Sequence, residues 1–296
     1  MYDIIIVGAG PAGLTAAIYA LRANKKVLIF ESKTYGGQIV NASLVENYPG
    51  IKSISGFELA TNLYNQVKDL GAEFKFETVI NITEDKKVTT NKDTYQAKAI
   101  ILATGAENRK LNINNETEFI GKGISYCATC DGNFYKHKTV AVNGGGNTAL
   151  EDAIYLSNIA DKVYLIHRRD EFRGENTYVE ELKKKDNVEF ILNSTITSIN
   201  GNQKLESITV TDNNNNTKNI SIDGLFIAIG QTPKNEIFAN IINLDNGYIA
   251  SSDGVHTNVE GIYVAGDTRV KELRQLTTAV SDGAIAATTA IKEMEK

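Results

Sequence analysis

The chain has 296 residues, of which 42% are hydrophobic and 23% charged, and a formal net charge of −5. This length exceeds that of most single domains, so we expect two domains of ordinary size. The acidic balance gives no reason to expect a nucleic-acid partner, and no apolar run approaches the about 20 residues that a membrane span needs. No basic signal segment precedes the first apolar run, so we expect a cytoplasmic protein without membrane contact.

The first motif is a nucleotide-binding turn near the N-terminus. An apolar strand at residues 3–7 leads into Gly8-Ala9-Gly10-Pro11-Ala12-Gly13 and a helical segment at residues 14–23. The first glycine permits a tight turn, the second lets the backbone approach a pyrophosphate, and the third lets helix and strand pack closely. The next strand, residues 26–30, ends in Glu31, whose carboxylate suits free ribose hydroxyls. The pattern predicts a dinucleotide site without a 2′-phosphate.

Further β-type segments complete this first unit. They lie at residues 73–82, 87–90 and 94–102 and end in the small-residue turn Ala103-Thr104-Gly105. We expect a β-meander here, followed by a crossing into a second unit near residues 108–114.

Both cysteines of the chain lie in Cys127-Ala128-Thr129-Cys130, which Asp131 follows. A zinc site would need two more ligands from the three histidines or from carboxylates, and an inert pair is a second alternative. A pair of this spacing can also cycle between dithiol and disulfide without other partners. A helix beginning after Cys127 would lower its thiol pKa. We favour redox chemistry and predict no metal site.

A second nucleotide-binding turn follows the cysteines. The motif Gly144-Gly145-Gly146-Asn147-Thr148-Ala149 stands between a strand at residues 139–142 and a helix that ends near residue 159. The next strand, residues 162–166, ends in His167-Arg168-Arg169, a cationic cluster where the first unit has a carboxylate, and Arg173 lies four residues beyond Arg169. Guanidinium groups bind a 2′-phosphate with charge-assisted hydrogen bonds, so this unit suits NADPH. The alternative is that the arginines are ordinary surface residues.

The second unit repeats the order of the first. Its β-type segments lie at residues 187–199, 205–211 and 218–228 and end in Ile229-Gly230, with a second crossing near residues 231–236. The strand and carboxylate at residues 261–267 and the helix at residues 277–294 form no third copy. We therefore predict an α/β fold of two Rossmann-like, three-layer dinucleotide-binding domains, each with a β-meander. The inserted domain spans residues 111–235, and residues 1–110 and 236–296 form the discontinuous one.

The motifs GAGPAG, CATCDG, GGGNTA, HRRDEFR and AGD occur in this order. Together they resemble the low-molecular-weight, bacterial-type thioredoxin reductases, flavoproteins with two dinucleotide-binding domains, and the match runs from residue 2 to about residue 294. The resemblance implies FAD in the discontinuous domain, NADPH in the inserted one, thioredoxin as the protein substrate, and a homodimer. It also implies that the inserted domain rotates about the two crossings.

The resemblance assigns roles to individual residues. Cys130 faces the flavin, Cys127 attacks the thioredoxin disulfide, and Asp131 moves a proton. The FAD positions are Gly8, Gly10, Pro11, Ala12, Gly13, Glu31, Gly37, Gln38, Asn47, Ala103, Thr104, Gly105, Asp267, Arg274 and Gln275. The NADPH positions are Gly144, Gly146, Asn147, Thr148, His167, Arg168, Arg169, Arg173, Ile229 and Gly230.

Several positions depart from the family pattern, namely Asn143, Gly174, Asn176 and the pair Lys234-Asn235. A lysine missing at position 176 weakens the expected grip on a 2′-phosphate, which leaves NADH or ferredoxin open as the donor. The ferredoxin-dependent relatives lack the second glycine motif and the arginine cluster, and this favours a pyridine nucleotide. Another small redox protein stays open as the acceptor, as does a non-catalytic sensor whose cysteine pair is a redox switch.

Overall fold

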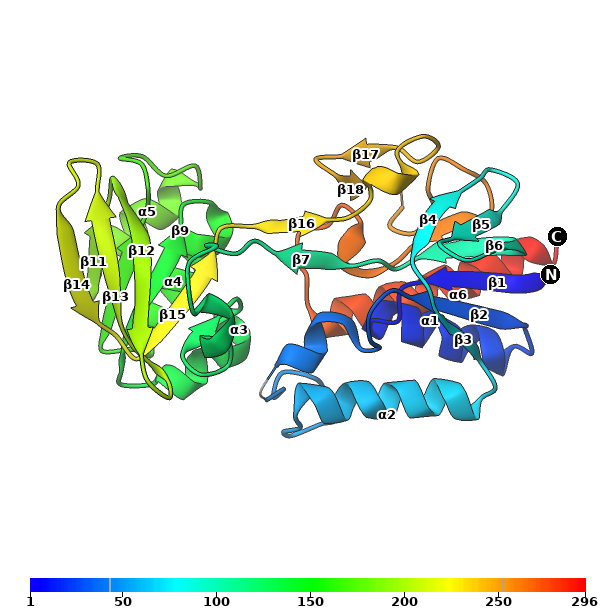
Figure 1. Ribbon diagram of the computed structural model, residues 1–296, viewed down its shortest axis with the longest axis horizontal. Coiled ribbons are helices and arrows are strands. Elements are labelled where there is room, and N and C mark those ends of the chain that lie inside the picture. The colour runs from blue at the N-terminus through cyan, green and yellow to red at the C-terminus, as the bar shows by residue number, and fades with distance from the viewer. Residues whose placement is uncertain (43, 252) are drawn as a thin grey trace. The chain divides into compact units, whose positions relative to one another are not determined.

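The computed structural model describes residues 1–42, 44–251 and 253–296. It divides into two compact units (Figure 1): unit 1 is Met1–Glu107 with Thr232–Lys296, and unit 2 is Asn108–Gln231. The chain enters and leaves unit 2 through β7 (Ala106–Asn108) and β16 (Gln231–Pro233), which pair with each other. The inserted domain expected from the sequence begins and ends a few residues later than unit 2.

Unit 1 is built on a seven-stranded sheet with the order β3-β2-β1-β6-β5-β4, and β19 pairs with β6. Strands β1, β2, β3, β6 and β19 are parallel, whereas β4, β5 and β6 form an antiparallel meander. The strands are β1 (Tyr2–Val7), β2 (Val27–Glu31), β3 (Glu73–Phe76), β4 (Val79–Ile82), β5 (Lys87–Thr90), β6 (Thr94–Leu102) and β19 (Ile262–Val264). The central strands read as apolar runs because both faces of a parallel sheet are covered.

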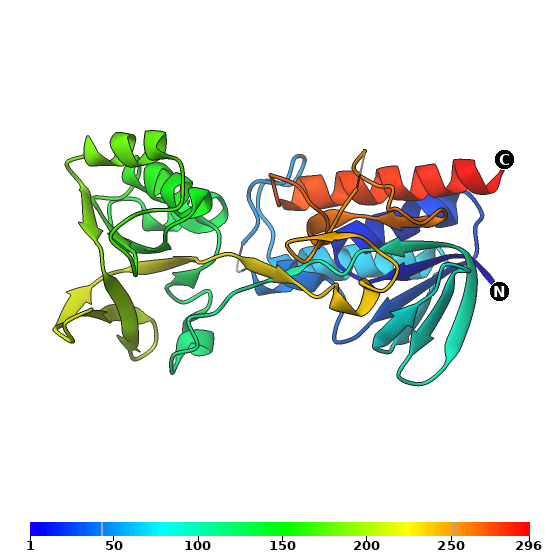
Figure 2. The ribbon, with the colours of Figure 1, turned by 90° about the horizontal axis from the view of Figure 1, so that it is seen from above.

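Helices cover one face of this sheet. They are α1 (Pro11–Arg22), α2 (Gly56–Asp69) and α6 (Leu276–Met294), and α6 lies on the same side of the sheet as α1 (Figure 2). The shorter elements of unit 1 are η1 (Gly37–Asn41), η4 (Glu236–Phe238), β17 (Leu244–Asp245), β18 (Tyr248–Ile249) and η5 (Gly266–Thr268). Both β19 and α6 come from the C-terminal segment, which therefore completes the first unit.

Unit 2 has three layers around a parallel sheet with the order β11-β10-β9-β15-β8. The strands of the sheet are β8 (Ile124–Ser125), β9 (Thr139–Gly144), β10 (Lys162–Ile166), β11 (Val188–Ile191) and β15 (Gly224–Ala228). One face packs on α4 (Asn147–Ser157) and α5 (Asn176–Lys183), and the other on the meander of β12 (Ser194–Gly201), β13 (Leu205–Asp212) and β14 (Thr217–Ser221). The remaining elements are η2 (Glu116–Phe119), α3 (Ala128–Asp131) and η3 (Gly132–Tyr135). Two Rossmann-like units with meanders confirm the predicted α/β fold class.

Three predicted β-segments are each divided in the structure. Residues 73–82 form β3 and β4, residues 187–199 form β11 and most of β12, and residues 218–228 form most of β14 and all of β15. In the first two segments the first strand extends the parallel sheet and the second opens the meander. In the third segment β14 closes the meander and β15 joins the parallel sheet. Between β11 and β12 the change of direction falls at Asn193, which has a left-handed φ of 52°. The sequence hid the division because both halves consist of strand-forming residues.

Among the residues that the structure describes, no helix combines the length and the apolar character that crossing a membrane requires.

Helices α1 and α6 approach closely at Gly283. A Cβ atom built on Gly283 would lie 2.2 Å from the Ala12 carbonyl oxygen and 3.1 Å from the Ala16 amide nitrogen. Backbone atoms cannot move aside as a flexible side chain can. The alanine faces of the two helices therefore pack only because residue 283 has no side chain.

A polar network holds the last turn of α6. The His256 ring contacts the carboxylates of Asp253 and Glu293, and the Tyr263 hydroxyl donates to Glu293 at 2.6 Å. Glu293 and then Asp253 raise the pKa of His256, because both favour its charged form, whereas partial burial opposes them. Glu293 lies on α6 and Tyr263 on β19, so this network joins two C-terminal elements of unit 1.

We predict that Gly283→Ala lowers the free energy of unfolding of unit 1 by about 1–3 kcal/mol, the usual effect of overpacking a core. Urea denaturation with hydrogen exchange in α1 and α6 measures this. The exposed control Ser281→Ala on the same helix should change stability by less than about 0.5 kcal/mol. Equal stability of Gly283→Ala and the wild type would show that the helices are not packed as described.

We also predict that His256 stabilises unit 1 in a pH-dependent way. A group whose pKa is raised on folding adds to the free energy of unfolding. This stabilisation is complete below the pKa of the unfolded state, near 6.5, and it is lost as pH rises through the pKa of the folded state. The stability difference between the wild type and His256→Gln should therefore shrink above pH 6.5. Urea denaturation of both proteins from pH 6 to 9 checks this, and a difference that grows with pH would contradict it.

Candidate active site

The redox turn is the segment from Ser125 to Gly132, and it carries both cysteines. Cys127 and Cys130 form a disulfide with their Cα atoms 5.3 Å apart. Cys127 is the N-cap of the four-residue helix α3. The turn packs tightly on α4, because a Cβ at Gly132 would lie 2.7 Å from Tyr155 Cε1. The two cysteines are thus held at disulfide distance by a turn with little room to move.

Asp131 lies beside the disulfide in a partly buried position. Its Oδ2 accepts a 2.7 Å hydrogen bond from Ser125 Oγ. Its Oδ1 is buried and has no hydrogen-bond partner among the described residues. Burial raises the pKa of Asp131, and the Ser125 hydrogen bond opposes that rise. A carboxyl group with one hydrogen-bonded oxygen, which fixes its orientation, and one oxygen without a partner is suited to carrying a proton.

A second buried carboxyl, Asp152 on α4, lies next to the same turn. It is 9% exposed and accepts a hydrogen bond from the Ala128 amide. Burial and the charge of Glu151 raise the pKa of Asp152 to about 7. The redox turn therefore has two acidic groups whose protonation is shifted toward neutral pH.

The redox turn is also fastened to the chain that enters unit 2. Glu116 is only 2% exposed, and its two oxygens accept from the Leu111 and Asn112 amides at 3.0 and 2.9 Å. The Tyr126 hydroxyl donates to the same carboxylate at 2.8 Å. One carboxylate thus joins residues just after β7 to the residue before Cys127.

The first glycine turn has the geometry of a phosphate cradle. A Cβ at Gly8 would lie 2.3 Å from the Ala103 carbonyl oxygen, and one at Gly13 would lie 1.9 Å from the Gly8 oxygen. Gly8 also has a left-handed φ of 109°. Gly10 is the N-cap of α1 and makes no side-chain cap, and Pro11 is the first helical residue. The first-turn amides of α1 therefore meet a turn without bulky side chains, which suits an anion.

Several predicted residues surround this turn. Glu31 Oε2 accepts from the Ala9 amide at 3.0 Å, so the carboxylate lies directly beside the turn. Gly37 has a φ of 59°, and a Cβ there would lie 3.2 Å from Gly10 Cα. Gln38 follows in η1 and is exposed. The structure thus brings the glycine loop after β2 against the glycine turn after β1.

Asn47 and Gln275 meet each other, although they are far apart in the sequence. Asn47 Nδ2 donates to Gln275 Oε1 at 3.3 Å. Gln275 is the N-cap of α6 and forms a capping box with Thr278.

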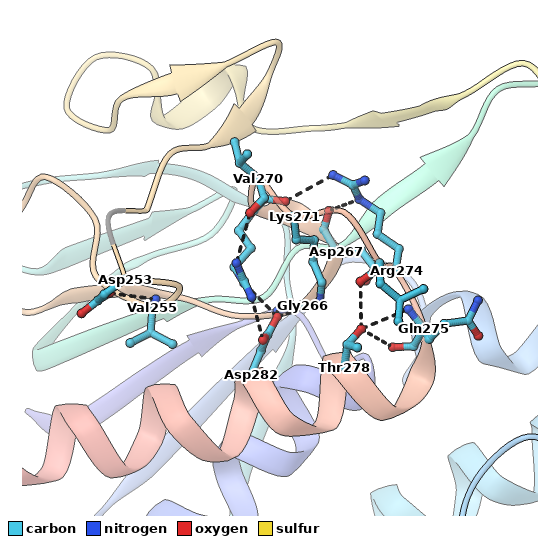
Figure 3. Close-up of polar contacts among 12 residues, drawn as sticks. Asp253, Val255, Gly266, Asp267, Val270, Lys271, Arg274, Gln275, Thr278 and Asp282 are labelled. Carbon is cyan, nitrogen blue, oxygen red and sulfur yellow. Dashed lines mark hydrogen bonds and ion pairs between the residues drawn. The ribbon is translucent and has the colours of Figure 1, made fainter. Parts of the chain in front are cut away.

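Asp267 lies in η5, between β19 and α6 (Figure 3). Its Oδ1 is buried without a hydrogen-bond partner in the described part of the chain. Burial raises the pKa of Asp267, against the charges of Lys271 and Arg274. Arg274 Nε donates to the Asp267 carbonyl, and its guanidinium lies 4.2 Å from the centre of the Tyr248 ring. Asp267 Oδ1 is therefore able to accept a further hydrogen bond.

A buried ion cluster supports this segment from below (Figure 3). Asp282 on α6 accepts from Arg269 Nε and Nη2 at 2.9 and 3.0 Å, from Lys271 Nζ at 2.8 Å, and from the Gly266 amide. The side chains of Asp282 and Lys271 are 7% and 6% exposed. Arg269 and Lys271 lower the pKa of Asp282 despite its burial, so the carboxyl stays charged and holds the backbone next to Asp267.

Thr104, after β6, belongs to another buried polar group. Its hydroxyl contacts the Thr268 hydroxyl at 2.7 Å and donates to Asn235 Oδ1 at 3.0 Å. Asn235 and Thr268 are both fully buried. Asn235, which departs from the family pattern, therefore secures the chain where it returns to unit 1. Ala103 is buried and Gly105 has a left-handed φ of 68°.

The second glycine turn repeats the geometry of the first. A Cβ at Gly144 would lie 2.3 Å from the Ala228 carbonyl oxygen, which is the same distance as that at Gly8. Gly146 is the N-cap of α4, again without a side-chain cap, and a Cβ there would meet nothing within 4 Å. Thr148 is exposed on the first turn of α4. Ile229 and Gly230, whose φ is 98°, follow β15 beside this turn.

His167 differs from the charged role predicted for it. The ring is 6% exposed, lies on the Phe172 ring, and occupies the space where a Cβ of Gly145 would be. Burial lowers the pKa of His167, so the ring is neutral at pH 7. Its Nε2 has no hydrogen-bond partner among the described residues. The ring therefore supports the turn from beneath and adds no positive charge.

The predicted arginines are placed at the surface near the second turn. Arg168, Arg169 and Arg173 are exposed, and the Arg173 amide donates to the Gly145 carbonyl at 2.7 Å. Gly174 also packs closely on the start of α4, since a Cβ there would lie 3.0 Å from the Asn147 amide nitrogen and 2.5 Å from Leu150 Cδ1. The arginine segment is thus folded back onto the start of α4.

Sequence reasoning missed the residues that hold these sites in place. They are Ser125, Glu116, Tyr126, Asp152, Asn235, Thr268, Arg269, Lys271 and Asp282. No motif in a single sequence marks them, because each acts through a side-chain contact or through burial that exists only in the folded chain. The described residues contain no cluster of three or more His, Cys, Asp or Glu side chains that could hold a metal ion.

Comparisons with known proteins agree with this geometry. A family model described as pyridine nucleotide-disulphide oxidoreductase matches residues 2–283. A thioredoxin reductase of Listeria monocytogenes is 43% identical over 302 residues, covering 100% of this chain and 95% of the relative. One of Mycoplasma genitalium is 46% identical over 293 residues, covering 97% and 93%.

A solved structure is similar over the whole chain. The crystal structure of thioredoxin reductase from Streptococcus pyogenes has a TM-score of 0.94 at 38% identity and covers 100% of this chain and 98% of that chain. These findings confirm the resemblance drawn from the five motifs. The chain therefore belongs to the pyridine nucleotide-disulphide oxidoreductase family and is a flavin disulfide oxidoreductase of the bacterial thioredoxin reductase type.

Proposed function

We propose that this enzyme transfers electrons from NADPH through FAD and the Cys127–Cys130 pair to the disulfide of thioredoxin. The observation that carries the proposal is the disulfide in the redox turn with the buried carboxyl of Asp131 beside it. The same chain has two glycine turns built for nucleotides.

The residues of unit 1 fit FAD. Gly8 and Gly13 have no room for a side chain, and Gly10, the N-cap of α1, leaves the backbone bare where a pyrophosphate approaches. Glu31 lies beside the turn, and the open, buried Asp267 oxygen suits a hydroxyl donor. The further FAD positions are Pro11, Ala12, Gly37, Gln38, Asn47, Ala103, Thr104, Gly105, Arg274 and Gln275. When bound, the flavin accepts a hydride from a nicotinamide and passes on electron pairs.

The residues of unit 2 fit NADPH. The N-terminus of α4, at Gly146, suits the pyrophosphate, and the exposed Arg168 and Arg169 follow the strand end where a 2′-phosphate is read. Asn176 supplies no positive charge there, so the arginines carry the recognition. The further NADPH positions are Gly144, Asn147, Thr148, His167, Arg173, Ile229 and Gly230.

The two cysteines have different tasks in this proposal. Cys130 takes up the electrons, and Cys127 attacks the disulfide of thioredoxin as a thiolate. Asp131 supplies and takes back a proton. Its raised pKa supports this role, because a buried carboxyl can hold a proton that an exposed one would release.

The proposal includes a homodimer and a cytoplasmic location. Both rest on the family resemblance, and the location also on the use of the two cysteines as a redox pair rather than a structural disulfide framework.

We predict that Cys127→Ser retains reduction of the flavin by NADPH and loses thioredoxin reduction, because Cys130 alone cannot complete the exchange. Anaerobic flavin bleaching and steady-state assays with thioredoxin measure the two steps separately. A Cys127→Ser enzyme with undiminished thioredoxin turnover would refute the role of Cys127. A chain that reduces its flavin but no thioredoxin even as wild type would favour the sensor or a different acceptor.

We predict that Arg168→Ala with Arg169→Ala raises KM for NADPH about tenfold or more and leaves KM for NADH nearly unchanged, since charged hydrogen bonds to the 2′-phosphate are lost. The control Lys183→Ala with Lys184→Ala removes the same charge from exposed positions at the C-terminal end of α5. It should leave both KM values unchanged. An equal rise for NADPH and NADH would show that the two arginines do not read the 2′-phosphate.

A further inference from the structure

Ser125 lies at the end of β8 and is the residue that joins Asp131 to Cys127. Its Oγ is 2.7 Å from Asp131 Oδ2, and the Cys127 amide donates to the same Oγ at 3.0 Å. The side chain is nearly fully buried, with 4% exposed. Water therefore has little access to replace either contact.

The hydroxyl has one proton, which decides the direction of these bonds. Asp131 Oδ2 at 2.7 Å is a nearer acceptor than the Cys127 carbonyl oxygen at 3.3 Å. The proton of Ser125 therefore lies toward Asp131, and a lone pair of the same oxygen receives the Cys127 amide. This arrangement ties Oδ2 and leaves the buried Oδ1 as the oxygen that can bind and release a proton.

Strand β8 makes this contact rigid. Ser125 pairs with Phe226 of β15, the strand that leads to the exit from unit 2, and Tyr126 is fixed by Glu116. The backbone that carries the hydroxyl is thus held on both sides. A change in the Asp131 carboxyl orientation would require breaking the Ser125 contact.

We infer that Ser125 is a positioning residue for the reaction, a role that rests on the proposed function of Asp131. It fixes Asp131 so that Oδ1 carries the transferable proton, and it links that carboxyl to the backbone of Cys127. The reduced pyridine nucleotide is oxidised and gives up a hydride, which is two electrons and one proton. The two electrons break the sulfur–sulfur bond and leave two thiolates. Asp131 Oδ1 gives its proton to one sulfur, which becomes a thiol, and the other sulfur stays a thiolate for attack. The proton of the hydride then returns the Asp131 carboxylate to its acid form.

Other titratable groups face this site and must be separated from Asp131. Tyr135 in η3 has its pKa raised to about 12, by burial and by the charges of Asp131 and Asp223, so it stays neutral below pH 10. Asp152, with Glu151 beside it on α4, titrates near pH 7. A pH profile therefore needs Asp152→Asn as well as variants of Ser125 and Asp131.

The test is the pH profile of kcat for thioredoxin reduction in the full enzyme with saturating NADPH. We expect kcat of the wild type to fall at high pH as Asp131 gives up its proton, and we call this decrease the alkaline limb. Asp131→Asn should lack the alkaline limb. The Ser125 hydrogen bond lowers the pKa of Asp131, so Ser125→Ala should move the limb to higher pH. Ser125→Ala should also lower the plateau, which is the pH-independent maximum of kcat, about tenfold, since the Asp131 carboxyl loses its fixed orientation.

Two further variants act as controls. Ser125→Thr retains a hydroxyl and should return the limb toward its wild-type position. Ser157→Ala removes a buried hydroxyl of the same unit that donates to Ile154, and it should change neither the limb nor the plateau.

The outcomes distinguish the role of Ser125 from the role of Asp131. An alkaline limb that Asp131→Asn removes and Ser125→Ala leaves in place would overturn the role of Ser125 while keeping that of Asp131. A limb that Asp131→Asn leaves intact at full rate would overturn the proposed acid itself. A limb that disappears only in Asp152→Asn would assign the titration to α4 and overturn the inference.

Discussion

Each unit of this enzyme depends on one close contact, in which a glycine packs against a backbone carbonyl at a distance that no side chain would allow. Gly8 meets the Ala103 carbonyl and Gly144 meets the Ala228 carbonyl, and a Cβ would lie 2.3 Å from the oxygen in both. The contact brings the turn before the helix directly against the end of the neighbouring strand, because neither glycine has a side chain. It therefore creates, in both units, the open helix N-terminus on which the proposed nucleotide binding depends.

The redox turn depends on a different constraint: contacts with several neighbouring elements hold its backbone and side chains in place. Gly132 packs it on α4, Tyr126 is tied to Glu116, and Ser125 joins Asp131 to the Cys127 amide. Disulfide exchange requires two sulfur atoms at a fixed distance and a proton-carrying group in a fixed orientation. These contacts supply both within unit 2.

The sequence predicted those features that depend on local pattern and spacing. The two glycine turns, the arginine segment, the cysteine pair and the alternation of strands and helices are all properties of neighbouring residues. What it could not predict depends on contacts that form only in the folded chain. Asp282 gains its importance from Lys271 and Arg269 in a buried cluster, and Asn235 from Thr104, more than a hundred residues earlier. His167 was predicted to add positive charge, but burial beneath Gly145 keeps it neutral.

The central claim is that the Cys127–Cys130 pair and a bound flavin exchange electrons in one enzyme. Anaerobic reductive titration of the purified wild-type protein, followed by flavin absorbance and by thiol count, tests this most directly. The account predicts that full reduction takes about two equivalents of NADPH per chain, one for the flavin and one for the disulfide, with two new thiols. Full reduction by one equivalent with no new thiols would contradict it.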